Sequence, residues 1–218
     1  MNKEELRTRQ LARIGVFSAL YGVLSLVPIS VFIGAPSFLA LNIIITPVIA
    51  LLLNPIEAFF TSLFGGIIAF YIAPFQAMFG PYTILLPVAG STFGSLAFHK
   101  GKTGGLAAAS FLAIAISAYL VKNFPFPYFI IPHSAALLAA LLASFKKMTL
   151  ISLKMPLYAF VSTMCEQGMM MIFAVHLIGL PWQAFVGILP LMVYERLLGT
   201  TGATLLSISL IKVGVFEY

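Results

Sequence analysis

The chain has 218 residues, of which 61% are hydrophobic and only 8% are charged. Its mean hydropathy of +1.08 excludes a soluble domain of this size and is typical of a polytopic membrane protein. The single cysteine, Cys165, excludes an intramolecular disulfide bond.

Eight apolar runs follow one another along the chain, separated by Pro, Gly, Asn or charged residues. About 20 helical residues cross the apolar core of a bilayer, so the short second and third runs are marginal spans that could form tilted helices. We therefore expect an all-α bundle of about six to eight transmembrane segments, forming one membrane domain over residues 1–218. The runs cover residues 12–33, 38–53, 56–73, 82–98, 105–121, 127–145, 156–178 and 186–211.

The positions of the charged residues predict how the chain is oriented. If the amino terminus is cytoplasmic, every Lys and Arg except Lys122 and Arg196 falls on the cytoplasmic side, which is the positive-inside pattern. Both termini are then cytoplasmic, and residues 1–11 form a basic, amphipathic start at the membrane surface. We expect a multi-pass protein of the plasma membrane.

Motifs for enzyme chemistry are incomplete in this sequence. Residues 101–103 (GKT) resemble the end of a phosphate-binding loop, but Leu96 stands where that loop needs a glycine. The three histidines, His99, His133 and His176, have no metal-ligand spacing, and no nucleophile elbow is present. We therefore expect a protein that is not an enzyme, with no cofactor, no metal site and no nucleic-acid partner.

A carboxylate interrupts the seventh apolar run near its middle. Glu166, followed by Gln167, stands about 15 Å from the inner end of this run at a rise of about 1.5 Å per residue. Ionisable residues at this depth cost about 2.5–3.5 kcal/mol and are functional by default. Glu195 and Arg196 lie in the outer half of the last run, about 100° apart on the helix, so they need not pair with each other. A ligand contact and a structural ion pair both stay open for them.

Other polar or amphipathic residues lie at compatible depths, Gln76 among them. Together they predict an outward-facing cavity in which a few polar groups orient a small solute. The alternatives are an interhelical hydrogen bond for Glu166 and interfacial positions for the aromatic residues. The predicted substrate-binding residues are Glu166, Gln167, Glu195, Arg196, Asn42, His133, Trp182 and Tyr82.

Small residues recur at a spacing of four in the first run, on two adjoining faces. One face carries Gly15 and Ala19, and the other carries Ser18 and Gly22. Such patterns let a second helix approach closely. The partner is either another helix of the same bundle or a helix of another subunit.

Four segments together resemble the substrate-binding S component of energy-coupling factor (ECF) vitamin transporters, in an archaeal-looking form. They are residues 12–28 (ARIGVFSALYGVLSLVP), 47–66, 163–168 (TMCEQG) and 193–200 (VYERLLGT). The resemblance implies a membrane protein that captures a vitamin or related micronutrient in an outward-facing pocket. It also implies two kinds of partner, a transmembrane coupling protein and two cytoplasmic ATPases that drive toppling of the binding subunit and release inside.

The sequence departs from the family in two respects. The commoner family architecture has six helices, and its coupling signature is an Ala-xxx-Ala pattern in the first helix. Here Gly15 and Ala19, or Ser18 and Gly22, occupy the matching positions. Two other functions stay open. A stand-alone proton-coupled carrier would use Glu166 as its proton site, and an intramembrane enzyme would use Cys165, Glu166 or Glu195.

Overall fold

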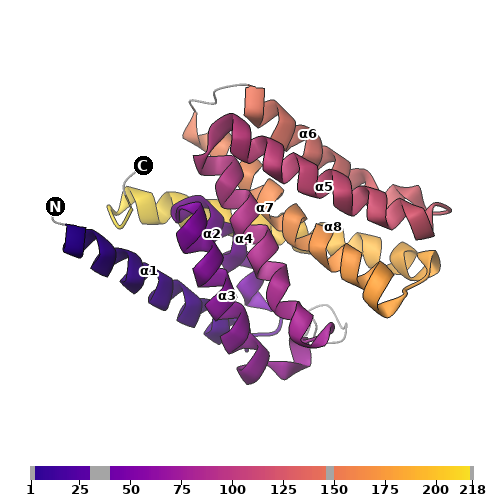
Figure 1. Cartoon of the computed structure of the whole chain (residues 1–218), viewed down its shortest axis with the longest axis horizontal. Helices are drawn as coiled ribbons and strands as arrows, with labels where there is room; N and C mark the ends of the chain where they lie inside the picture. Colours follow the sequence, from indigo (N-terminus) through magenta and orange to yellow (C-terminus); the bar gives the residue numbers. More distant parts are fainter. Residues whose placement is uncertain (1–2, 30–39, 146–149, 217–218) are drawn as a thin grey trace.

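The computed structural model describes residues 3–29, 40–145 and 150–216. Within these ranges the chain forms eight α-helices and no strand, which confirms the predicted all-α bundle (Figure 1). The helices are α1 (Lys3–Leu24), α2 (Ile45–Leu52), α3 (Pro55–Ile72), α4 (Leu85–His99), α5 (Gly101–Asn123), α6 (Ile131–Phe145), α7 (Ile151–Phe173) and α8 (Trp182–Lys212). Short 3₁₀ turns precede α2, α4 and α6, and a π-helical turn, Ala174–Ile178, ends α7.

Each predicted apolar run overlaps one of these helices. The first helix begins earlier than its run, at Lys3, because no helix breaker separates the basic start from the apolar residues. Its basic start is thus helical over the described residues. Residues 1–2 of that start lie outside the described ranges, as do residues 30–33 of the first run and 38–39 of the second.

Four helical stretches are long and apolar enough to cross a membrane. They are Pro55–Ile72, Gly101–Asn123, Pro127–Phe145 and Ile151–Ile178. The surface of the bundle carries many large apolar side chains, such as that of Val121, which is 79% exposed. Apolar surface on this scale marks contact with a membrane or a partner, so the bundle has the features of an integral membrane protein.

Helix α2 is the shortest of the described α-helices. It and the preceding 3₁₀ turn make a short apolar helix, Leu41–Leu52, and every residue of α2 is buried. It packs against α4, α7 and α8. The chain then turns sharply at Asn54, whose side chain accepts hydrogen bonds from the backbone N–H groups of Ile56 and Glu57 and so caps α3. This helix boundary lies where the sequence predicts it.

Helices α4 and α7 approach each other closely through two glycines. A Cβ atom at Gly94 would lie 2.5 Å from the Cβ of Ser162, and one at Gly90 would lie 2.8 Å from the Cβ of Glu166. The Ser162 hydroxyl donates a hydrogen bond to the Gly90 carbonyl at 2.9 Å. The backbone of α4 therefore packs directly against the part of α7 that carries Glu166.

The two small-residue faces of α1 have different surroundings. The Ser18 hydroxyl donates to the Thr61 carbonyl of α3 at 2.9 Å, and a Cβ at Gly22 would lie 2.4 Å from Ile68 Cγ2. Gly15 and Ala19 are exposed instead. The Ser18/Gly22 face is thus an internal contact with α3, and the Gly15/Ala19 face points out of the bundle.

Both ends of the described chain lie at the same end of the bundle (Figure 1). The guanidinium of Arg13 lies over the ring of Phe216 at 4.8 Å, and the Phe17 and Phe216 rings are 5.9 Å apart. Gly214, with φ of +75°, reverses the chain after α8 and brings Phe216 back against α1. We refer to this as the terminal end of the bundle.

Replacing Gly94 by Ala should destabilise the bundle, because the added methyl group would have to push α4 away from α7. We expect the free energy of unfolding in detergent to fall by about 1–3 kcal/mol. Gly187→Ala is the matched control, since a Cβ there meets no atom within 4 Å. Equal stability of the two variants would contradict the close α4–α7 contact.

Candidate substrate-binding site

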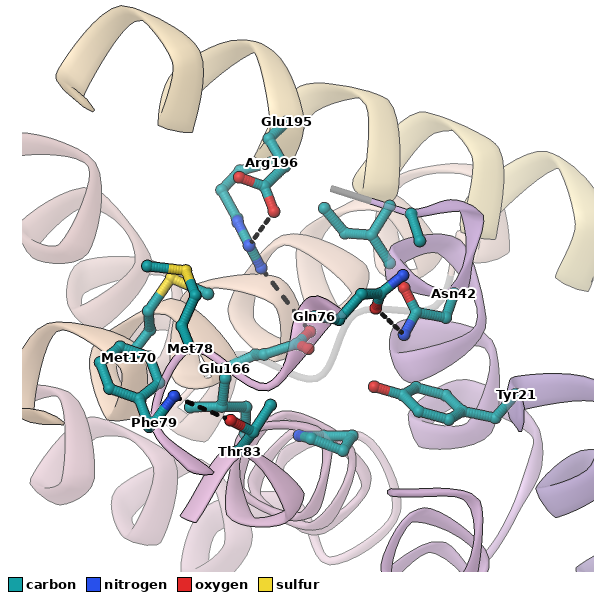
Figure 2. Close-up of a pocket in the computed structure, with 14 residues that line it drawn as sticks. Tyr21, Asn42, Gln76, Met78, Phe79, Thr83, Glu166, Met170, Glu195 and Arg196 are labelled. Carbon is teal, nitrogen blue, oxygen red and sulfur yellow. Dashed lines mark hydrogen bonds and ion pairs between the residues drawn. The ribbon is translucent and has the colours of Figure 1, made fainter. Parts of the chain in front are cut away.

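A small polar cavity lies at the end of the short helix Leu41–Leu52 that is remote from the terminal end of the bundle, and Figure 2 shows its lining residues. Its wall is formed by the last turns of α1, the start of α2, the α3–α4 connection, the start of α4 and the middle of α7 and α8. Its polar lining residues are Tyr21, Asn42, Gln76, Thr83, Glu166, Glu195 and Arg196, and its volume is about 60 Å³. That volume holds a few water molecules.

Arg196 is the centre of a buried charge cluster in this cavity. Its Nη2 donates to Glu195 Oε1 at 2.5 Å, and its Nη1 lies 3.6 Å from Glu166 Oε2. Nη1 also donates to the Thr163 carbonyl at 3.1 Å. The neighbouring residues Glu195 and Arg196 therefore do pair, because the long arginine side chain brings its guanidinium back to Glu195 while it reaches α7.

The cluster combines two carboxylates with one guanidinium. With all three groups ionised it carries one formal negative charge. Glu166 Oε2 and Arg196 Nε are buried and have no hydrogen-bond partner among the described residues. Buried charged groups need such partners to offset the loss of solvation, so the cluster can accept an additional polar or cationic group.

Two glycines allow the helices that carry the cluster to approach each other. Gly90 of α4 packs on the Cβ of Glu166, as described above. At Gly199 of α8, a Cβ would lie 3.2 Å from the Ile43 carbonyl oxygen and 3.3 Å from Thr163 Cγ2. The start of α2, α7 and α8 therefore meet next to Arg196, which explains how one side chain reaches both carboxylates.

The wall opposite the cluster is held by side-chain amides. Asn42 Nδ2 donates to Ser25 Oγ at 2.8 Å and lies 3.5 Å from Gln76 Oε1. Gln76 Nε2 donates to the Ser25 carbonyl. These bonds join the end of α1, the start of α2 and the α3–α4 connection, and the Tyr21 hydroxyl faces the same space (Figure 2).

The structure brings together four of the eight predicted binding residues, namely Asn42, Glu166, Glu195 and Arg196. The described lining does not include the other four. Gln167 and His133 are buried in α7 and α6, and Gln167 Oε1 and His133 Nε2 have no hydrogen-bond partner among the described residues. Tyr82 is half exposed with its ring 5.9 Å from that of Phe173, and Trp182 is partly exposed at the start of α8.

Several lining residues are absent from the predicted set. Tyr21 and Thr83 contribute hydroxyl groups, and Met78, Phe79 and Met170 contribute apolar surface. The sequence does indicate Gln76, as an amide whose predicted depth is compatible with an outward-facing cavity. Nothing distinguishes Tyr21 from the other seven tyrosines, because its place depends on how α1 packs against α3.

The other reactive residues lie outside this cavity. Cys165 is fully buried in α7 and is not part of the described lining. In the described ranges, no group of three or more His, Cys, Asp or Glu residues is arranged to hold a metal ion.

Comparisons with protein-family models, curated proteins and solved structures find no match. The assignment of this site therefore depends on its geometry.

Replacing Arg196 by Met should leave two buried carboxylates without their cation. We expect a loss of about 3–5 kcal/mol in the free energy of unfolding, the cost of breaking a buried ion pair from one side. The triple variant Arg196→Met, Glu166→Gln, Glu195→Gln removes all three charges and should regain part of this stability. Thermal unfolding in detergent measures both, and a triple variant less stable than Arg196→Met would contradict the charge compensation.

Proposed function

We propose that this chain is the substrate-binding subunit of an ATP-driven importer of the ECF type. It captures a vitamin or related micronutrient and passes it on together with a transmembrane coupling protein and two ATPases. The observation that carries this proposal is the buried cluster of Arg196 with Glu166 and Glu195, which lines a polar cavity inside an apolar bundle. Ionisable residues at such positions mark substrate pathways because they are costly to bury.

The proposed orientation places the terminal end of the bundle in the cytoplasm and the Arg196 cavity toward the outside, in the plasma membrane. Two observations support it. Arg9 and Arg13 lie near Phe216 at the terminal end, where the positive-inside pattern expects cations. The cavity lies at the other end of α2, so a solute arriving from outside would reach it first.

The charge balance of the cluster favours a substrate that carries a cationic or amine group. Arg196 already contacts two carboxylates and a backbone carbonyl, so it offers less to a substrate carboxylate than an unpaired arginine would. Glu166 retains a buried oxygen that accepts no hydrogen bond from a described residue. A substrate ammonium or protonated ring nitrogen near Glu166 would neutralise the remaining negative charge.

A vitamin-sized ligand needs more space than the observed cavity offers. Small-molecule sites usually enclose about 300–1,000 Å³, compared with about 60 Å³ here. The part of the wall best suited to move is the connection between α3 and α4, which consists of short 3₁₀ turns. It is held by the Phe79 and Tyr82 rings against Phe173, at 5.6 and 5.9 Å. We propose that substrate entry displaces this connection.

The exposed Gly15/Ala19 face of α1 is the proposed docking surface for the coupling protein. Ser18 and Gly22 are occupied by the contact with α3, which leaves Gly15 and Ala19 as the small residues that a helix of another subunit could approach. A Cβ at Gly15 would meet no atom within 4 Å. Small residues at this spacing promote close helix packing in membranes.

Glu166→Gln should weaken substrate binding and leave expression intact. Loss of one charge-assisted contact costs about 1.5–3 kcal/mol, or about 10- to 100-fold in affinity. The ligand retained by the purified protein, identified by mass spectrometry, serves for the binding titration. Glu57→Gln is the matched control, because Glu57 is also buried but does not line this cavity. Unchanged binding by Glu166→Gln would assign Glu166 a structural role.

Ala19→Leu should block association with the coupling protein and spare substrate binding, because the larger side chain keeps a second helix at a distance. Co-purification of the ATPase subunits measures association. Ala113→Leu, at another exposed alanine on α5, should leave it intact. Loss of both association and binding would mean that Ala19 belongs to an internal contact.

A stand-alone proton-coupled carrier is the second candidate. The charge cluster favours it, because two carboxylates share one cation there. The carboxylate in excess can take up a proton. Uptake by liposomes that contain only this chain, lost when the proton gradient is dissipated, would favour the carrier. The importer proposal fails if the chain, expressed with its coupling proteins, binds no micronutrient and never co-purifies with ATPases.

A further inference from the structure

A second and larger cavity lies at the terminal end of the bundle. Its volume is about 480 Å³, and the proposed import function does not use it. Residues from four parts of the chain meet there: the first half of α1, the α2–α3 turn, the end of α4 and the segment after α8. The residues used in the argument are Arg9, Arg13, Asn54, Glu57, His99 and Phe216.

Two guanidinium groups line this cavity. Arg9 is exposed and Arg13 is half buried, and the Arg13 guanidinium lies 4.8 Å above the Phe216 ring. Neither arginine forms an ion pair with a described carboxylate. The only carboxylate among the described lining residues is Glu57. The lining therefore has an excess of positive charge, and arginine is the side chain best suited to bind phosphate through paired hydrogen bonds.

The charged cavity continues into a second cavity of mixed character. This neighbouring cavity of about 320 Å³ shares Leu52, His99 and Phe216 with the first; Lys154 adds a cation to its lining, and Phe98 and Ile211 add apolar surface. A ligand that suits both surfaces has a phosphate at one end and a hydrocarbon chain at the other.

This site is separate from the Arg196 cavity. The two cavities lie at opposite ends of the short helix Leu41–Leu52, since Asn42 lines one and Leu52 the other. Ten residues at about 1.5–2.0 Å per residue separate them by about 15–20 Å. A ligand in one cavity therefore does not contact residues of the other.

We propose that the cavity at the terminal end binds the phosphate of an anionic phospholipid headgroup. Arg9 and Arg13 donate hydrogen bonds to the phosphate oxygens, and the acyl chains lie along the apolar residues of the neighbouring cavity, Phe98 and Ile211 among them. Basic pockets between helices near the cytoplasmic surface are typical headgroup sites. The apolar residues of the neighbouring cavity, such as Leu51, Phe98 and Ile211, favour a lipid over a soluble phosphate compound, which would leave them uncovered.

The test uses the delipidated full-length protein in detergent, titrated separately with phosphatidylglycerol, phosphatidylcholine and inorganic phosphate. Retained lipid is measured by native mass spectrometry, and stabilisation is measured by thermal unfolding. The wild-type protein should retain phosphatidylglycerol in preference to phosphatidylcholine. Arg9→Gln should weaken phosphatidylglycerol binding about fivefold, and Arg9→Gln with Arg13→Gln roughly 25-fold. Arg7→Gln is the matched control, because Arg7 is exposed on α1 outside the cavity lining.

Three results would overturn the proposal. The first is an equal loss of lipid binding in Arg7→Gln, which would indicate surface charge alone. The second is equal retention of the two lipids. The third is stabilisation by inorganic phosphate with no further gain from lipid. Arg9→Gln alone keeps the Arg13–Phe216 contact, so its effect is measurable even if the double variant does not fold. Because no transported substrate is needed, the result is independent of the importer proposal.

Discussion

The need to compensate charge inside an apolar bundle determines the arrangement of α7 and α8. Arg196 is the cation for two buried carboxylates, and its guanidinium reaches both only because α8 lies close to α7 next to Gly199. The same closeness at Gly90 places the backbone of α4 against Glu166. The cluster thus requires small residues on the neighbouring helices.

Hydroxyl groups and glycines join the other helices. Ser18, Ser95 and Ser162 each donate to a backbone carbonyl of a neighbouring segment, at 2.9, 2.6 and 2.9 Å. In lipid, where apolar side chains gain little from leaving one apolar environment for another, close packing and interhelical hydrogen bonds supply the attraction between helices. This explains why serines are buried while large apolar side chains point outward.

Much of the helix order is predictable from the sequence, because breaks have local causes. Asn54 caps α3, and Gly101 and Gly179, with φ of +56° and +75°, end helices where the chain must turn. Helix α1 begins before its apolar run, at Lys3, because hydropathy detects the apolar part of a helix and not its basic extension. The number of spans and the side of the termini stay predictions.

The grouping of Glu166, Glu195 and Arg196 was predictable from the sequence, but the directions of the other side chains were not. Charge and helix rise placed Glu166, Glu195 and Arg196 near one another, and the structure brings them together. The same reasoning gave Tyr82 and Trp182, which lie outside the cavity lining because depth along a helix does not say which face a side chain occupies. Tyr21 was missed because its position depends on tertiary packing.

The complete burial of α2 has a consequence for the order in which the protein matures. The helix Leu41–Leu52 is about half the length that crosses a bilayer, and α2 packs mainly on α4, α7 and α8. Two of these three partners are synthesised after most of the chain has left the ribosome. Helix α2 therefore reaches its final surroundings only after α8 has been synthesised, so a truncated product that lacks α8 leaves α2 partly uncovered.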